Sequence, residues 1–361
     1  MKNFEKWDEN FRKQNLFVFN REENALLWLK VRAVCRSKQI EQFCLENDIK
    51  LCSTKITEQN IELFEILEKT PNAMQMLDNY LRVKSHNWYD ALGIDEIKLK
   101  EDLYKIREYK WGGNQNNSLD KHLVSRYVKV ISDFDELYDR QGEIADNAWN
   151  YVLTSWYNNW TSYLIESIFK RHPKVVSAVG EIKSVDFFID NDPIDLKVTF
   201  FPNEYMEKKL KTKLGKNELS WLKAKAKSVG ITTNNTQSPS QQIYTLTEKL
   251  NELGYNDILE ELRLAKADIV EEAQRNKNDL ITWLYANQGE MRFGAENRIF
   301  VILVDSHNMN DSWKMKRAFN LIEPQIIQYL NNYNINTLSE VNFTFKKNTY
   351  KSLADAIFVV K

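Results

Sequence analysis

The chain has 361 residues, of which 43% are hydrophobic and 28% are charged, and its formal net charge is −1. This balance excludes a disordered chain, and it excludes a general electrostatic attraction to nucleic acid. Any binding of DNA or RNA must therefore depend on basic residues that are concentrated locally. Only 10 glycines and 6 prolines are present, which disfavours an all-β sandwich with many tight turns.

The N-terminal segment, MKNFEKWDENF, lacks the apolar core of a signal peptide, and no stretch is long and apolar enough for a membrane span. We therefore expect a cytoplasmic protein without a membrane partner. Three cysteines, Cys35, Cys44 and Cys52, fall within a short region that is predicted to be helical. Their spacing lacks the CxxC pattern of zinc sites, so buried, reduced thiols are the favoured interpretation.

The N-terminal region is predicted to be mainly helical. Residues 16–19 (LFVF) favour a short strand, and Asn20 with Glu23 resembles a capping box that opens a helix. Further helices are expected to begin at Thr57 and at Thr70-Pro71 and to occupy 87–110, before a loop over 111–118.

A helical pattern then extends from Leu119 to about Arg171, with a break near Gln141. Its second half carries a stripe of large apolar side chains at helical spacing, which includes Trp149, Val152, Trp156, Trp160, Tyr163, Leu164 and Ile168. Core packing is the favoured explanation of this stripe, and base stacking by a tryptophan is the alternative.

Residues 184–202 (SVDFFIDNDPIDLKVTFFP) predict two strands joined by a polar corner at 190–193. Asp186 opens the first strand, and alternation places Asp195 and Lys197 on one face of the second. Two carboxylates and an ammonium at one edge of a sheet suit Mg²⁺ beside a phosphate, because Mg²⁺ prefers hard oxygen ligands. A lysine next to the metal can orient water or stabilise developing charge.

Acid-x-lysine triplets are common in this chain and are not specific by themselves. The serious competitor is Glu181-Ile-Lys183, which is close to the hairpin. Asp195 is preferred because it lies in an apolar strand that follows another acid-bearing apolar strand. The run Phe187 to Ile189 indicates burial on both faces, where ionised groups are costly unless they are paired or bound to metal. The alternative is an amphipathic edge hairpin with solvated charges.

Asp186, eight intervening residues and Asp195-Leu196-Lys197 together resemble the motif of the PD-(D/E)XK nuclease superfamily, which has the restriction-endonuclease-like fold. Gly180 and Glu166, the latter on the preceding helix, are also similar to that arrangement. The resemblance covers about residues 160–200. Two departures are that Val185 stands where the motif has proline and that no QxxxY motif is evident downstream.

The resemblance implies roles for these residues by position. Asp186, Asp195, Glu166 and the backbone carbonyl of Leu196 are expected to bind Mg²⁺, for which Mn²⁺ can substitute. Lys197 is expected to assist catalysis. These four side chains, Asp186, Asp195, Lys197 and Glu166, form the predicted catalytic set.

Two further segments are candidates for contacts with nucleic acid. Residues 208–227 are rich in lysine. Contact with the phosphates of nucleic acid and a solvated helix or loop face explain these lysines equally well. Around two glycines in 282–298, Gln288, Glu290, Arg292 and Asn297 either read base edges or cap a turn, and the sequence does not separate these alternatives. The specific candidates are Lys208, Lys209, Lys211, Lys213, Lys223, Gln288 and Arg292.

The C-terminal part alternates between helices and strands. After a polar loop predicted at 228–242, helices are expected over 243–286 and 313–333. Strands are expected over 298–305 (RIFVILVD), 341–345 and 356–360, the first of them buried on both faces because its apolar run is nearly continuous. The sequence therefore predicts an α+β fold with a central mixed β-sheet flanked by helices.

We divide the chain into a helical N-terminal region, 1–143, for DNA binding or dimerisation, and a nuclease domain, 144–361, with a helical insertion at about 205–290. The predicted function is Mg²⁺-dependent endonucleolytic cleavage of double-stranded DNA, of type II restriction character. A homodimer is expected because duplex cleavage needs two active sites, and a cognate DNA methyltransferase is expected to be encoded nearby without being bound. The alternatives are an anti-phage effector nuclease that acts on DNA or RNA, and a catalytically silent nucleic-acid-binding protein.

Overall fold

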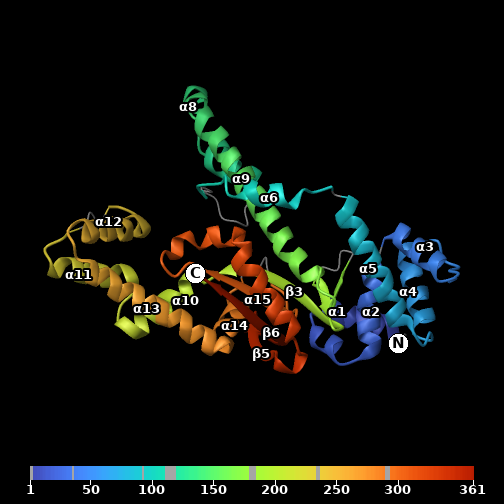
Figure 1. The fold of residues 1–361 in the computed structure, drawn as a ribbon. Helices are drawn as coiled ribbons and strands as arrows, with labels where there is room; N and C mark the ends of the chain where they lie inside the picture. The colour runs from blue at the N-terminus through green and yellow to red at the C-terminus, as the bar shows by residue number, and fades with distance from the viewer. Residues whose placement is uncertain are drawn as a thin grey trace.

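The computed structural model describes residues 3–34, 36–91, 93–109, 119–178, 184–232, 236–288 and 293–361. A six-stranded mixed β-sheet forms its centre, and helices flank the sheet (Figure 1). The N-terminal helices gather at one end of the molecule, a helical lobe lies at the other end, and a helical arm projects from the body (Figure 1). The predicted α+β class with a mixed sheet is therefore confirmed.

The strands occur in the spatial order β1-β2-β3-β4-β6-β5. β3 runs parallel to β4 and β4 runs parallel to β6, whereas the remaining neighbours are antiparallel. Their bounds are β1 Val175–Ser177, β2 Phe187–Ile189, β3 Asp192–Phe200, β4 Arg298–Val304, β5 Ser339–Phe345 and β6 Asn348–Val360. Every residue of β4 is buried, so the prediction of a strand covered on both faces is confirmed.

β2 and β3 form the predicted hairpin. Asp190 and Asn191 make its turn with φ values of 47° and 78°, the left-handed geometry that two-residue hairpin turns require and that Asp and Asn tolerate. The buried ammonium of Lys30, on α2 (Glu23–Ala33), donates to Asn191 Oδ1 at 2.6 Å and to Asp78 Oδ1 at 2.5 Å. The hydrogen bond from Lys30 to Asn191 thus connects the hairpin turn to the N-terminal helices.

Each face of the sheet has its own helical cover. The face with Phe300 and Ile302 shares a core with α10 (Asn203–Leu214), α11 (Glu218–Ser228), α12 (Pro239–Glu252), α13 (Asn256–Arg275) and α14 (Lys277–Ala286). The face with Ile299 and Val301 packs against α9 (Gln141–Lys170) and α15 (Phe319–Asn331). Alternate residues of β4 thus face different helical layers, as the period of a strand requires.

The N-terminal helices form a third core that also contains Val176, Val185 and Phe188. These helices are α1 (Asn3–Arg12), α2, α3 (Ser37–Glu46), α4 (Ile56–Leu67) and α5 (Ala73–Ala91), and α6 (Glu96–Leu103) follows them. Because β1 and β2 contribute to this core, the N-terminal region packs directly on the first strands. Cys44 is a buried thiol of this core, as predicted, but Cys52 is exposed and Cys35 lies outside the described residues.

Two N-terminal predictions are wrong. Residues 16–19 belong to a 3₁₀-helix, η1 (Leu16–Asn20), rather than to a strand, because a three-residue period turns both Leu16 and Phe19 into the N-terminal core. The capping box at Asn20 is also absent: α2 follows Glu22, whose side chain makes no capping hydrogen bond.

Later boundaries also differ from expectation. The polar loop after α11 ends at Ser238, because Ser238 and Gln241 form a capping box that opens α12. The helix expected from 313 is a 3₁₀-helix, η4 (Met309–Arg317), followed by α15, and β6 begins eight residues before its expected start. In the 119–171 segment, Lys129 to Asp133 are not helical, whereas the break near Gln141 is confirmed at Arg140.

The apolar stripe of α9 is only partly core. Leu164 and Ile168 are buried against the sheet, but Trp149 and Val152 are 63% and 52% exposed, so core packing is the wrong explanation for those two. The reason is that the N-terminal half of α9 extends beyond the edge of the sheet, as part of the arm (Figure 1). None of the helices that the structure describes is both long and apolar enough to cross a membrane.

Candidate functional site

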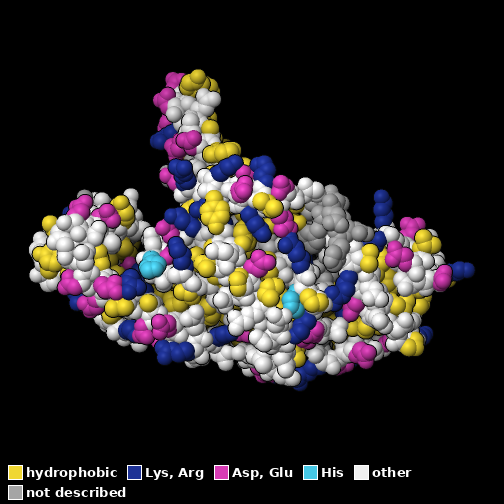
Figure 2. All heavy atoms as spheres, in the orientation of Figure 1, with side chains coloured by type: hydrophobic (Ala, Val, Ile, Leu, Met, Phe, Trp, Pro, Cys, Tyr) yellow, Lys and Arg dark blue, Asp and Glu magenta, His cyan; other side chains and the backbone are white. Residues whose placement is uncertain are grey.

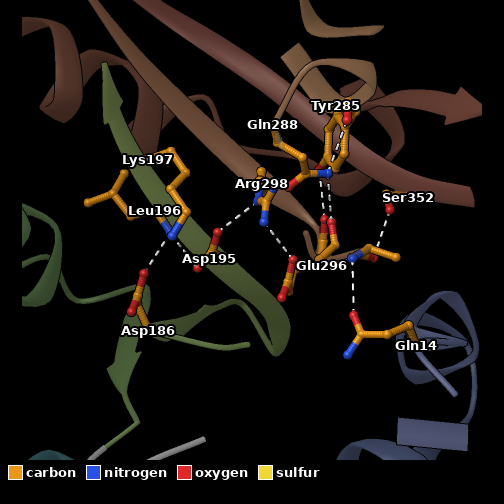
Figure 3. A network of polar contacts seen from close by, with 12 residues as sticks. Gln14, Asp186, Asp195, Leu196, Lys197, Tyr285, Gln288, Glu296, Arg298 and Ser352 are labelled. Atoms are coloured by element: carbon orange, nitrogen blue, oxygen red, sulfur yellow. Dashed lines mark hydrogen bonds and ion pairs between the residues drawn. The ribbon is translucent and has the colours of Figure 1, made fainter. Parts of the chain in front are cut away.

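β2 and β3 bring Asp186, Asp195 and Lys197 to one place (Figure 3). The backbone N–H of Asp186 donates to the carbonyl of Ile194 at 2.9 Å, and the Asp186 carboxylate accepts the N–H of Leu196 at 2.7 Å. One residue further on, Lys197 Nζ donates to Asp195 Oδ1 at 3.0 Å. The hairpin therefore holds both acids around the peptide group that precedes Leu196, with the lysine beside them.

Asp195 is a buried residue that contacts both a half-exposed lysine and a buried arginine. Its side chain is 8% exposed, whereas that of its partner Lys197 is 50% exposed. Its second oxygen, Oδ2, accepts a hydrogen bond of 2.8 Å from Nε of Arg298, which is 5% exposed. The parallel register pairs Asp195 of β3 with Arg298 of β4, which is why the two side chains meet.

Arg298 uses its remaining donors within the protein (Figure 3). One guanidinium nitrogen donates to Gln288 Oε1 and another donates to Glu296 Oε2, both at 2.7 Å. The guanidinium carbon also lies 5.2 Å from the centre of the Tyr285 ring, and the Tyr285 hydroxyl donates to the Glu296 carbonyl at 2.6 Å. Arg298 is therefore a buried cation between two carboxylates, an arrangement that compensates charges which would otherwise be costly to bury.

Arg298 and Glu296 also belong to this site, although they were not predicted from the sequence. The signal was present: Glu296 and Arg298 stand at the start of a strand whose other residues are apolar, so both charges had to be buried and paired. What the sequence lacked was the partner, because Asp195 is 103 residues away.

Burial, together with the charges around Asp186, favours the protonated form of its carboxyl group. Burial raises the pKa of the Asp186 carboxyl to about 6, and the negative charge of Asp195 adds to the increase. The hydrogen bond from Leu196 acts in the opposite direction, and the attraction of Lys197 opposes the increase less than that bond does. Burial also raises the pKa of Glu296, against the effect of Arg298. Negative charge thus outweighs positive charge near Asp186.

Glu166 lies on α9 and forms an ion pair with Lys170, one turn further along the same helix. Its negative charge makes a smaller contribution to the raised pKa of Asp186 than burial and Asp195 do. Across the described ranges, no set of three or more His, Cys, Asp or Glu side chains is arranged to hold a metal ion. The structure therefore joins Asp186, Asp195 and Lys197 and leaves Glu166 near them but engaged with Lys170.

Gln288 and Asn297 make their contacts inside the protein. Gln288 Nε2 donates to the carbonyls of Tyr285 and Gly294, while its Oε1 accepts from Arg298. Asn297 Nδ2 donates to the Pro193 carbonyl at 3.1 Å, and its Oδ1 accepts from the N–H of Leu353. These bonds favour the turn-capping interpretation over the reading of bases. Glu290 and Arg292 lie outside the described residues, as do Gly180 and the competing triplet 181–183.

The lysines after β3 are divided between ion pairs and open surface. On α10, Lys209 Nζ lies 2.8 Å from Asp279 Oδ2 and 3.2 Å from Glu272 Oε1, and Lys213 forms an ion pair with Asp268. Lys208 and Lys211 are exposed on the same helix, and Lys223 of α11 is half-buried. Acidic residues of α13 and α14 therefore neutralise part of the basic run.

Comparison with protein-family models, with curated proteins and with solved structures found no match to this chain. The chemistry of the site is therefore the basis for assigning a function. Paired carboxylates with a half-exposed ammonium beside them can hold a divalent cation and a phosphate, and they can also remain solvated charges of a hairpin. The solvated alternative does not fit Asp195, which is buried and paired with Arg298, and burial leaves Asp186 with a raised pKa.

Proposed function

We propose that this chain is a Mg²⁺-dependent nuclease with Asp186, Asp195 and Lys197 at its active site. The observation that carries the proposal is the contact geometry of the hairpin, which holds two carboxylates of neighbouring strands around one peptide group with a lysine beside them. Mg²⁺ commonly takes one or two protein carboxylates and completes its shell with water and phosphate oxygens, so this pair is sufficient.

The charge balance supports a cation at this position. Burial and the nearby Asp195 raise the pKa of Asp186, so the ionised form of this carboxyl group is disfavoured. A divalent ion between the two carboxylates would stabilise the ionised form. Asp195 would keep Arg298 on Oδ2 and offer Oδ1, from which the half-exposed Lys197 can withdraw. We assign the metal to Asp186, Asp195 and the Leu196 carbonyl, with Mn²⁺ as a substitute, and Glu166 would join them only by leaving Lys170.

The bound metal would neutralise phosphate charge and lower the pKa of a water molecule. Within the chain, Lys197 orients that water or stabilises the charge that develops on the phosphate. Arg298 holds Asp195 in place from the interior. A mixed sheet flanked by helices, with the acids on adjacent strands, is compatible with the restriction-endonuclease-like fold that the sequence resembles.

We infer that double-stranded DNA is the substrate and that the enzyme is of type II restriction character. Lys208 and Lys211 support this inference, because α10 begins shortly after β3 and exposes both side chains where they can contact phosphates. A DNA methyltransferase encoded nearby would agree with this role. Cleavage of RNA alone would instead favour the effector nuclease.

The test is cleavage of supercoiled plasmid by the purified full chain with Mg²⁺, with Mn²⁺ and with a chelator. We expect nicking or linearisation with either metal, and a loss of at least about 100-fold in rate for Asp186→Asn, Asp195→Asn and Lys197→Met. Asp190→Asn is the matched control, because it neutralises an exposed acid in the turn of the same hairpin. It should cleave like the wild type.

Two results would overturn the proposal. One is that unmodified DNA, modified DNA and RNA all remain intact with both metals. The other is that Asp186→Asn and Asp195→Asn cleave as fast as Asp190→Asn.

A further inference from the structure

The C-terminal part of β6 has a neighbouring strand on one side only. Pairing between β5 and β6 ends at Ser339 and Ala354, whereas β6 continues beside β4 to Val360. Before Ser339 the chain forms a 3₁₀-helix, η5 (Ile335–Thr337), and not a longer β5. Residues 355–360 are therefore an edge of the central sheet, and we call them the open edge.

Alternation along the strand determines which backbone groups lie on the open side. The N–H and C=O of one residue point to the same neighbouring strand, and those of the next residue point to the opposite side. The N–H of Lys361 donates to the carbonyl of Val304, so the odd-numbered residues of this segment face β4. Ala356, Phe358 and Val360 consequently direct their backbone groups away from β4.

Most of these backbone groups have no partner. The Ala356 N–H donates to Oδ1 of Asp355 at 2.7 Å. In the part of the chain that the structure describes, no residue bonds to the Ala356 carbonyl, to either backbone group of Phe358, or to the Val360 N–H. A peptide strand parallel to β6 can satisfy all of these groups and leave the Ala356 N–H with Asp355.

A groove of about 420 Å³ lies along the open edge, a volume within the range of ligand sites. One wall comes from the end of α13 and the start of α14, with Gln274 and Lys277. The other wall comes from α15, with Gln325, Gln328 and Tyr329. Because α14 and α15 cover opposite faces of the sheet, an occupant between them would continue the plane of the sheet.

The groove also contains a side-chain donor without a partner. The Tyr329 hydroxyl is shielded from solvent and forms no hydrogen bond with the described residues. Burial and the negative charge of Asp355 raise the pKa of Tyr329, so the hydroxyl stays protonated and can donate. Buried polar groups without a partner are rare, and this one indicates that a water molecule or a ligand supplies the acceptor.

The charges at the groove balance each other. Lys277 Nζ lies 3.0 Å from Asp355 Oδ1, and Gln274, Gln325 and Gln328 contribute uncharged amides. On the face seen in Figure 2, basic and acidic side chains are interspersed over the body. This arrangement gives no advantage to a partner rich in phosphate, whereas an uncharged polar peptide meets amide donors and acceptors on both walls.

We propose that the open edge binds an extended peptide with uncharged polar side chains, which adds a strand to the sheet. Hydrogen bonds to the free backbone groups of Ala356, Phe358 and Val360 give the affinity, and the amides of the two walls select the side chains. The site is separate from the proposed nuclease site, because β4 lies between β6 and β3.

Hydrogen exchange of the full chain, resolved by residue with mass spectrometry, tests the proposal. The probe is the peptide acetyl-Thr-Gln-Thr-Gln-Thr-amide at about 5 mM, where even millimolar affinity is detected. We expect the probe to slow exchange at the Phe358 and Val360 amides at least about 10-fold. The amides of Ile357 and Val359 face β4 and should change little.

The matched control ligand is the same peptide with every backbone nitrogen methylated. It keeps the side chains but has no main-chain donor, so it should not slow exchange. Adenosine is a third probe, because its base also offers neighbouring donors and acceptors. We expect no protection from adenosine.

Two variants that fill the groove locate the site. Gln325→Trp and Gln328→Trp change exposed side chains of α15, so each should keep the circular dichroism of the wild type and lose the protection. Gln42→Trp changes an exposed side chain of α3 and should bind the peptide like the wild type.

Four results would each overturn the proposal. They are unchanged exchange with the peptide, which would mean that the groove holds only water, equal protection by the methylated peptide, protection by adenosine alone, and undiminished protection in both α15 variants. None of these measurements involves cleavage. They therefore decide the peptide site whether or not the plasmid test supports the nuclease.

Discussion

The hairpin site buries charged side chains, whereas the arm exposes large apolar ones. Both regions therefore differ from the usual distribution of side chains in a folded protein. Around Asp195, charged side chains lie in the interior: Arg298, Glu296 and Asp195 are each less than about a tenth exposed. On the arm, Trp149 and Tyr138 are about two-thirds exposed. A protein gains stability by burying apolar groups and solvating charges, so both regions forgo stability. Each region is therefore organised for something other than the stability of a free monomer.

Removing the buried cation should have the largest effect. Arg298→Leu leaves Asp195 and Glu296 buried without their partner, and we expect it to lower the free energy of unfolding by about 3–5 kcal/mol. Urea unfolding followed by circular dichroism measures this change. Arg263→Ala is the control, because Arg263 pairs with Glu260 on an exposed helix surface and should leave the midpoint nearly unchanged. Equal midpoints for both variants would contradict the view that the site depends on buried charge.

The free energy of unfolding should depend on pH because the pKa of Asp186 is higher in the folded state than in the unfolded state. Its folded pKa of about 6 lies above the ordinary 3.8, so between these values the folded state binds more protons than the unfolded state. Stability therefore declines as pH rises from about 4 to about 6 and then levels off. Asp186→Asn removes this contribution and should be the more stable protein above pH 6, by up to about 3 kcal/mol.

The measurement is urea unfolding of metal-free wild type and Asp186→Asn across this pH range. The difference between them isolates Asp186 from Asp192 and Glu296, whose pKa values are also raised by burial. Addition of Mg²⁺ should stabilise the wild type above pH 6 and leave Asp186→Asn less affected. A constant difference at every pH would contradict the assigned pKa.

The smallest effect is expected on the arm. Trp149→Ala should change the free energy of unfolding of the monomer by no more than about 0.5 kcal/mol, because the side chain is exposed. Leu164→Ala, about four turns further along the same helix, should cost about 2–5 kcal/mol because Leu164 is 1% exposed. Thermal unfolding at low protein concentration compares them. A large loss for Trp149→Ala would place that tryptophan in the core of the monomer.

Several features of the fold and site could be predicted because they depend on neighbouring residues in the chain. The alternation of β3 placed Asp195 and Lys197 on one side, and their side chains do contact each other. The apolar run of β4 identified a strand covered on both faces, since only a fully buried strand tolerates it. The Asp190–Asn191 corner indicated the hairpin that brings Asp186 to Asp195. Side-chain periodicity and turn chemistry are local properties, and local sequence determines them.

Other features were decided only when distant segments packed together. Asp195 meets Arg298 because β3 and β4 pair in one register across the intervening helices, and no spacing in the sequence specifies that register. Trp149 and Leu164 belong to one apolar pattern, yet the sheet lies beneath Leu164 alone. Periodicity establishes which side chains share a face of a helix. Whether that face is buried depends on what packs against it, which is why the sequence predicted a core where the structure has an exposed arm.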